Sequence, residues 1–303
     1  MAKNCFRKTF FCFLFLFVLL NPYVKSQYIY NFSSHNFLQF NPAYAGQDTN
    51  HCFFLGAELD PDLLNHISER PRHHPYTFQL SYAGNFKKFR SGLAAIGSIS
   101  GIGVEKAYDI TVSYNYNFII NDSSNLRVGL NWHERIMHID PRLFIFNDPG
   151  GNDLSLIKKS SFNFDLGLWY VYKKFNLGFS VQNIFEKKNI QIGSSLYEQG
   201  FNAIAGYEFV IAGPVKTKPA VIFHNFGGSY STYLLSNSFV FDDTFILGIG
   251  YTFGESQYRN GPFYLEVGAH AGKHVLLMLG YSNSFYINSF SERISAMVKV
   301  NLY

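Results

Sequence analysis

The chain has 303 residues, of which 18% are aromatic and 15% charged, and its formal net charge is +4. Four of the 25 Lys and Arg residues, and no acid, fall within the first 26 positions, which leaves 21 bases and 21 acids in residues 27–303. A neutral chain gives no reason to expect nucleic-acid binding. The mean hydropathy of −0.02 argues against a protein that crosses a membrane as helices, but it is compatible with strands that are apolar on one face.

The N-terminus has the pattern of a secretory signal peptide. Three basic residues precede an apolar run of eleven residues, Phe10 to Leu20, and Val24 and Ser26 occupy positions −3 and −1 of a cleavage site. The run is too short for a transmembrane helix. We therefore expect residues 1–26 to be removed and Gln27 to be the first residue of the mature protein.

The rest of the chain is predicted to be one domain. Cys5 and Cys12 would leave with the signal peptide, so Cys52 alone remains and no intrachain disulfide is expected. No Pro/Ser-rich linker or change of composition divides residues 27–303. We expect a β domain in which residues 27–50 form an N-terminal periplasmic segment.

Many segments alternate between apolar and polar residues with a period of two. One face of residues 110–118 carries Ile110, Val112, Tyr114, Tyr116 and Phe118, and the other carries Thr111, Ser113, Asn115 and Asn117. Residues 77–82, 126–133, 175–182 and 263–270 alternate in the same way, and helical spacing fits none of them. This pattern predicts strands with one face toward lipid and one toward a polar interior.

About fourteen such strands follow one another along the chain. They are predicted at 53–57, 77–83, 92–99, 108–119, 126–138, 162–172, 175–181, 201–210, 218–224, 231–241, 244–253, 263–270, 275–282 and 293–303. The connections alternate in length. The mostly long ones are 58–76, 100–107, 139–161, 182–200, 225–230, 254–262 and 283–292, and the intervening ones are mostly short, including Lys173-Lys174 and Asp242-Asp243.

This alternation predicts an all-β fold, a transmembrane antiparallel up-and-down β-barrel with long extracellular loops, short periplasmic turns and both termini in the periplasm. A soluble β-sandwich is the main structural alternative. Aromatic residues near strand ends, among them Tyr172 and Tyr251, and small polar residues on the opposite faces favour the barrel.

Two segments near the start of the expected mature chain resemble a known family. They read Gln27-Tyr28-Ile29-Tyr30-Asn31 and Phe40-Asn41-Pro42-Ala43-Tyr44-Ala45-Gly46. The second is similar to the Asn-Pro-Ala-Tyr-Ala-Gly motif of the PorP/SprF family, outer-membrane proteins of the type IX secretion system. Residues 164–170, 176–183 and 245–251 resemble later strands of that family. The chain departs from the family pattern in having no Trp within residues 53–76 and no His in Phe290-Ser291-Glu292-Arg293.

The resemblance implies an outer-membrane barrel that helps to secrete or retain surface adhesins by docking them, in some species with gliding motility. The implied partners are outer-membrane lipid, a large secreted adhesin, and periplasmic type IX secretion or envelope-anchoring components. The alternative is a transport barrel for a small or hydrophobic solute. An apolar pocket with a lateral opening would favour transport, and a lumen blocked by side chains would favour docking.

The hexapeptide is the candidate partner-docking motif, made up of Asn41, Pro42, Ala43, Tyr44, Ala45 and Gly46. A residue before proline is restricted to extended geometry, so the Asn-Pro pair predicts a turn. Tyr44 is an aromatic anchor that could contact a periplasmic partner or plug the mouth of the barrel. A structural turn that closes the barrel floor is the other interpretation, and the two are compatible.

Ionisable residues on the polar strand faces form a second group of candidates. They are Arg127, His133, Asp165, Glu208, Glu266 and His270. We expect them to face the lumen and pair there, because a charge facing lipid near the midplane costs several kcal/mol. They would form either a packed polar interior or a constriction in contact with a plug.

Residues with other chemistry do not form recognisable sites. His66, His73 and His74, with His51 and Cys52 nearby, lack metal-ligand spacing, and residues 148–153 lack the ligand pattern of an EF-hand loop. His133, Glu134 and His138 lie close together in sequence, but no nucleophile motif accompanies them. We therefore expect no metal, no cofactor and no enzymatic activity.

Overall fold

The structure is a computed structural model that describes residues 32, 37–47, 51–61, 75–102, 105–140, 156–185, 199–226, 230–254, 260–286 and 289–302. The expected signal peptide and Gln27 lie outside these residues. Within the described part of the chain, no helix is long and apolar enough to cross a membrane.

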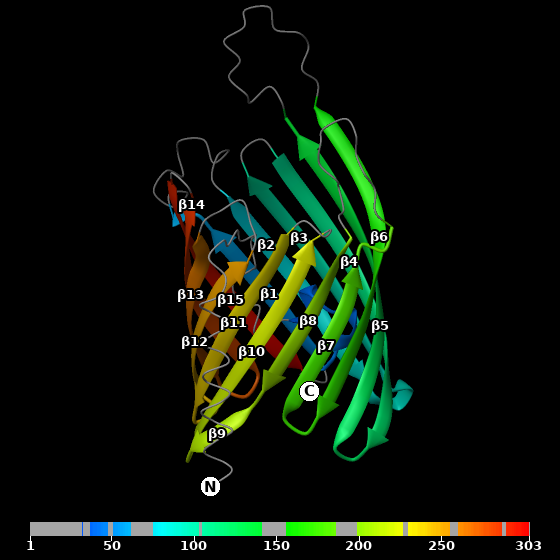
Figure 1. Ribbon diagram of the computed structural model, residues 1–303, viewed down its shortest axis with the longest axis vertical. Coiled ribbons are helices and arrows are strands. Elements are labelled where there is room, and N and C mark those ends of the chain that lie inside the picture. Colours follow the sequence, from blue (N-terminus) through cyan, green and yellow to red (C-terminus); the bar gives the residue numbers. More distant parts are fainter. Residues whose placement is uncertain are drawn as a thin grey trace, which may run out of the picture.

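The described residues form a barrel of antiparallel strands, most of which pair with their neighbours in sequence (Figure 1). The strands are β1 (His51–Leu59), β2 (Tyr76–Phe86), β3 (Ser91–Ile102), β4 (Glu105–Asn121), β5 (Ser124–Ile139), β6 (Ile157–Tyr172), β7 (Phe175–Gln182), β8 (Gly200–Tyr207), β9 (Phe209–Ala212), β10 (Val215–Phe226), β11 (Tyr230–Phe241), β12 (Phe245–Gly254), β13 (Asn260–Ala271), β14 (Val275–Tyr286) and β15 (Ser289–Leu302). β8 and β9 both pair with β10, so together they occupy one position in a wall of fourteen strands. Each of the fourteen predicted strands overlaps one of these, and the predicted fold is confirmed.

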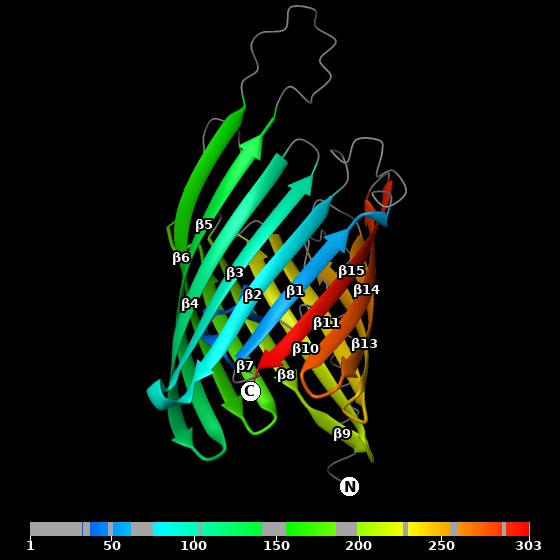
Figure 2. The same ribbon diagram turned by 180° about the vertical axis from the view of Figure 1, so that it is seen from behind.

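The barrel closes through pairing of β1 with β15. His51 is opposite Leu302 on one side and opposite Gly84 on the other, close to the short connection between β2 and β3. The start of β1 and the end of β15 therefore lie at the end of the barrel that carries the short turns (Figure 2). We call this the short-turn end.

Several of the short turns use left-handed backbone. Lys173 has a φ of 54° in the turn between β6 and β7, and Asp242 and Asp243 have φ values of 51° and 48° between β11 and β12. Such positive φ values fit the right-handed twist of paired strands, and Asp tolerates them better than most residues.

The two faces of the wall differ in chemistry as predicted. On β4, Ile110, Val112 and Tyr114 are 45–51% exposed on the outside, whereas Ser113 and Asn115 are fully buried inside. Outward aromatic rings also contact one another across neighbouring strands toward the long-loop end. Phe201, Phe223, Tyr233 and Phe253 form such a row, with centroid separations of 5.1, 4.8 and 5.2 Å. An apolar outer surface with aromatic rows is typical of barrels that stand in a bilayer.

Several hairpins extend further than predicted. β3 and β4 reach Ile102 and Glu105, and β14 and β15 reach Tyr286 and Ser289, so the predicted long loops at 100–107 and 283–292 are mostly strand. β5 and β6 contain 16 residues each, or about 50 Å at about 3.3 Å per residue. That exceeds an apolar band of about 25 Å even when the strands are tilted. Pairing thus continues beyond the membrane, where no alternation of side chains marks it.

Candidate functional site: a plug in the barrel lumen

The described part of the N-terminal segment, residues 37–47, lies inside the barrel, and we call it the plug. It contains two 3-10 turns, η2 (Phe37–Gln39) and η3 (Pro42–Tyr44), and η3 contacts the inner faces of β4, β5 and β6. Residues 27–50 were predicted as a periplasmic segment, but the described part of this range occupies the lumen.

Asn41 and Pro42 set the conformation of the plug. Asn41 is extended, with φ −148° and ψ 114°, as expected for a residue before proline. Its Oδ1 accepts a hydrogen bond of 2.9 Å from the Ala43 N–H and so caps η3. Pro42 occupies the first turn, where the missing N–H costs nothing. The predicted turn is therefore present.

The same side chain ties the plug to the wall. Nδ2 of Asn41 donates to the Leu168 carbonyl at 2.9 Å and to the Phe179 carbonyl at 3.0 Å. Asn41 is fully buried, so each polar atom of its side chain needs a partner within the protein. Because it bonds both η3 and the wall, Asn41 fixes the height of the plug in the barrel.

The wall approaches the plug closely at glycines. A Cβ on Gly129 of β5 would lie 2.4 Å from the Ala43 nitrogen, and one on Gly92 of β3 would lie 2.1 Å from the Ala45 oxygen. Both distances are shorter than real Cβ contacts, and both involve backbone atoms rather than the flexible end of a side chain. Only glycine fits at these two inward-facing positions.

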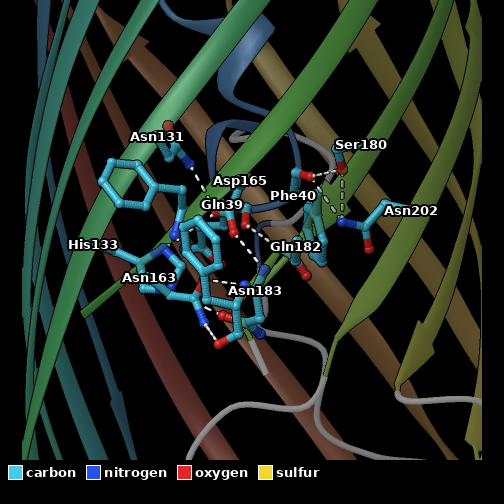
Figure 3. Close-up of polar contacts among 12 residues, drawn as sticks. Gln39, Phe40, Asn131, His133, Asn163, Asp165, Ser180, Gln182, Asn183 and Asn202 are labelled. Atoms are coloured by element: carbon cyan, nitrogen blue, oxygen red, sulfur yellow. Dashed lines mark hydrogen bonds and ion pairs between the residues drawn. The ribbon is translucent and has the colours of Figure 1, made fainter. Parts of the chain in front are cut away.

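Wall side chains donate to the main-chain carbonyls of the plug. The Ala45 oxygen accepts from Asn115 Nδ2 at 2.7 Å and from an Arg127 nitrogen at 2.9 Å. The Phe40 oxygen accepts from Ser180 Oγ and, at 2.8 Å, from Asn202 Nδ2 (Figure 3). The Gln39 oxygen accepts from Gln182 Nε2 at 3.2 Å. The wall therefore recognises the backbone of this segment, as a receptor recognises a bound peptide.

An aromatic cluster packs next to these hydrogen bonds. The Tyr44 ring meets the Trp169 ring edge to face at a centroid distance of 4.8 Å, and Phe37 contacts both rings at 5.4 and 5.6 Å. Trp169 is 1% exposed and Tyr44 is 9% exposed. In this structure Tyr44, the predicted anchor, contacts the barrel itself; the docking role of the motif stays a prediction.

A polar network lies beside the plug on the inner faces of β5 and β6 (Figure 3). Asp165 accepts from the Asn183 N–H at 2.8 Å and from Asn131 Nδ2 at 3.2 Å, and its carboxylate lies 3.4 Å from His133 Nδ1. The other His133 nitrogen is 2.9 Å from Asn183 Oδ1. The network thus ties the chain leaving β7 to the neighbouring strands.

The remaining predicted ionisable residues also face the lumen, but they do not all pair with one another. Fully buried Glu266 accepts from the Phe32 N–H at 2.7 Å, and Arg127 bonds the plug as described. Glu208 lies 3.2 Å from Lys174 and 3.5 Å from Lys218. His270 lines a cavity at the short-turn end. Two of the six predicted residues, Arg127 and Glu266, thus bond the N-terminal segment, whereas His133 and Asp165 lie together and Glu208 pairs with lysines.

The other chemical candidates lie partly outside the described residues, and those within them do not come together as a site. Among the described residues, no group of three His, Cys, Asp or Glu side chains could hold a metal ion. His66, His73, His74 and residues 148–153 lie outside the described residues. His51 Nδ1 is hydrogen bonded to the Tyr82 hydroxyl at 2.6 Å. Glu134, which accepts from Ser160, lies on the opposite face of β5 from His133.

Two cavities adjoin the plug and its wall. The first, of about 620 Å³, lies between the plug and the short-turn end, and we call it the vestibule. Its apolar base includes Phe37, Tyr44 and Trp169, and its rim includes Lys173, Lys174, Glu208, Lys218 and Lys299. The second, of about 790 Å³, is a hollow on the outer face of β5–β8, lined mainly by apolar side chains including Leu166, Leu168, Phe179 and Phe201.

Sequence reasoning missed the residues that hold the plug. Asn115 and Ser180 are predictable only as members of polar strand faces, and Asn202 and Gly92 fall in predicted strands with nothing to mark them as contacts. The available signal was the coincidence of Gly and Asn at inward positions of successive strands. It indicates that backbone rather than a side chain fills the lumen.

Solved structures with the same fold include several outer-membrane barrels. The CymD monoaromatic hydrocarbon channel matches with a TM-score of 0.55 and 10% identity, covering 88% of this chain and 93% of its own. The toluene transporter TodX of P. putida matches with 0.55 and 11%, covering 88% and 94%. A FadL homologue of Pseudomonas aeruginosa gives 0.50 and 10%, covering 87% and 93%. Identities this low show the barrel fold alone.

Sequence comparison identifies the family. A search of curated proteins finds no match. The model of one family, described as type IX secretion system membrane protein PorP/SprF, matches residues 21–302. This match covers nearly the whole chain and agrees with the closed, outwardly apolar barrel, and the protein therefore belongs to the PorP/SprF family of outer-membrane barrels of the type IX secretion system.

Proposed function

We propose that this protein is a docking barrel of the type IX secretion system that helps to secrete or retain surface adhesins. Its long-loop end would face the adhesin and its short-turn end would face periplasmic secretion or envelope-anchoring components. The barrel would act as a rigid, closed scaffold without chemistry of its own. In gliding species the retained adhesin would serve motility.

The observation that carries this proposal is the filled lumen. Seven hydrogen bonds join the wall to Asn41 and to the carbonyls of Gln39, Phe40 and Ala45. At about 1 kcal/mol net for each bond, they oppose withdrawal of the plug by roughly 7 kcal/mol before any apolar contact is counted. A barrel closed this firmly is suited to holding partners at its two ends.

Covalent fixation of the plug tests the proposal. Gln39 Nε2 and Gln79 Oε1 are 2.6 Å apart, so cysteines at these two positions can be joined by a short bismaleimide in a Cys52→Ser background. Docking predicts an unchanged amount of surface adhesin per folded barrel after cross-linking. The two single-cysteine variants are the matched controls, and heat-modifiable gel mobility reports folding. Loss of surface adhesin only in the cross-linked protein would count against a static scaffold.

The second candidate is a transport barrel for a small or hydrophobic solute. It is favoured by the apolar hollow of about 790 Å³ on the outer face of β5–β8 and by the likeness in fold to a monoaromatic hydrocarbon channel. Filling the hollow by Phe179→Trp and Phe201→Trp should then reduce uptake of labelled toluene by cells that carry the barrel. If cells that carry the unsubstituted barrel take up no more toluene than cells without the protein, this candidate is removed.

A further inference from the structure

The vestibule combines an apolar base with a basic rim. Phe37, Tyr44 and Trp169 form the base, together with Ile204 and Leu276. The rim carries four lysines and one carboxylate, given by Lys173, Lys174, Lys218, Lys299 and Glu208. Glu208 is shared between Lys174 and Lys218 at 3.2 and 3.5 Å, so one carboxylate serves two ammonium groups. The cavity therefore favours an anionic ligand that also has an apolar part.

Three polar atoms of the lining have no hydrogen-bond partner within the described residues. They are Gln47 Oε1 at the end of the plug, Trp169 Nε1 on β6 and Asn301 Oδ1 on β15. Trp169 is 1% exposed, and a buried indole N–H without a partner is unfavourable. The three residues line one cavity, and the atoms comprise one donor and two acceptors.

We propose that the vestibule binds an extended polypeptide segment of a periplasmic partner, in which a carboxylate side chain lies next to an apolar one. The carboxylate meets Lys174 and Lys218, and the apolar side chain packs on Tyr44 and Trp169. Main-chain N–H and C=O groups supply both kinds of partner that the three polar atoms lack, whereas a fatty-acid anion has no donor for the two oxygens. This inference rests on the proposed docking function and places one of its contacts.

Photo-cross-linking in cells tests the proposal. Asn176 lines the vestibule and its side chain points inward, so p-benzoylphenylalanine at this position should capture the bound segment. The captured peptide, sequenced by mass spectrometry, should contain Asp or Glu within two residues of an aromatic or aliphatic residue. The matched control position is Thr111, an inward-facing residue on β4 beyond the plug toward the long loops, where the same peptide should not be captured.

Charge removal at the rim provides the second arm. The double substitution Lys174→Gln and Lys218→Gln should lower the yield of this cross-link about tenfold, as expected for the loss of two weak ion pairs. Lys174→Arg and Lys218→Arg should retain it. Lys87→Gln and Lys88→Gln, at exposed positions of η4 (Lys87–Phe89) in another turn at the same end, should leave the yield unchanged. Heat-modifiable mobility shows whether each barrel is folded.

Four results would overturn the inference. They are capture of lipid only, an intrachain cross-link to residues 27–36, a captured peptide without a carboxylate, and a yield that ignores the charge at Lys174 and Lys218. Surface adhesin measured in the same strains separates this result from the docking function. If the peptide is captured specifically, but the strain with Lys174→Gln and Lys218→Gln displays as much adhesin as the unsubstituted strain, the vestibule contact is supported and the adhesin role is contradicted.

Discussion

The two sides of the lumen hold the N-terminal segment by different forces. The polar wall, the inner faces of β4–β8, presents Asn, Ser and Arg donors to the plug carbonyls, with Asn115, Ser180 and Asn202 each at most 4% exposed. The apolar wall lies opposite, on β1, β11, β12, β14 and β15. It packs around Phe32 with Phe54, Val240, Ile246, Leu276, Met278 and Met297.

Because of this difference, one wall mainly determines the position of the plug, and the other mainly stabilises the segment by burying apolar area. Hydrogen bonds are directional, so the polar wall determines which residue of the plug lies at which height. Apolar contact is non-directional and scales with buried area, so the apolar wall adds stability but does not by itself specify register. On this side the directional contact is the hydrogen bond from the Phe32 N–H to Glu266 of β13. The two walls should therefore respond differently to conservative substitution.

The largest effect is expected from Gly129→Val on the polar wall. Its Cβ would lie 2.4 Å from the plug backbone, so the plug must move, at a cost of about 3 kcal/mol or more. The chain has two Trp residues, so Trp132→Phe leaves Trp169 as a reporter whose emission should shift to the red. Gly97→Val is the matched control because a Cβ there meets nothing within 4 Å. Equal denaturation midpoints for the two variants would contradict the close approach.

Tyr44→Ala should have the next largest effect and lower the free energy of unfolding by about 3 kcal/mol. The substitution empties a site of 9% exposure and removes the edge-to-face contact with Trp169. Denaturation monitored by Trp169 emission in the Trp132→Phe background should show both the loss of stability and a more polar indole environment. Tyr114→Ala removes the same side chain from the outer face of β4 and should leave Trp169 emission unchanged.

The strands could be predicted from the sequence because each membrane-spanning strand has one apolar face. Outside the bilayer that requirement ends, and the continuations of β3, β4, β14 and β15 carry no alternation that marks them. The local geometry of Asn41-Pro42 was also predictable, since proline restricts the residue before it.

The location of the plug was not predictable in the same way. Its contacts join residues far apart in the chain, such as Ala45 with Arg127, 82 positions apart, and Phe40 with Asn202, 162 positions apart. In the sequence, an inward-facing Asn looks the same whether its side chain is hydrogen bonded to water, to another side chain or to a main-chain carbonyl. Only the closed register of the strands brings Asn115, Arg127 and Ala45 together.

Substitutions that keep side-chain size on the two walls should have smaller effects on stability than the two changes above, and these effects should differ between the walls. Asn115→Leu removes one of the two donors to the Ala45 oxygen and the acceptor of the Gly92 N–H at 3.1 Å, which should cost about 2 kcal/mol. Met278→Leu on the apolar wall keeps volume and polarity and should cost less than about 1.5 kcal/mol. Chemical denaturation of both variants measures the difference. If Met278→Leu proved the more damaging, the apolar wall would be the one that specifies position.

The smallest effect is expected at the rim of the vestibule, where Glu208 meets Lys174 and Lys218. These side chains are 30%, 46% and 52% exposed, and pairs of this exposure contribute at most about 1 kcal/mol. Glu208→Gln should therefore lower stability slightly at low salt and not at all near 1 M salt, where charges are screened within about 3 Å.

Glu58→Gln is the contrasting control, because Glu58 and Arg293 are 2.6 Å apart and both side chains are less than one-tenth exposed. Breaking a buried pair costs about 3 kcal/mol, and salt should barely alter that cost. If the rim pairs proved as costly to break and as insensitive to salt as the pair of Glu58 and Arg293, they would act as a structural clamp. A rim with weak, screened pairs leaves its lysines able to exchange Glu208 for the carboxylate of a partner.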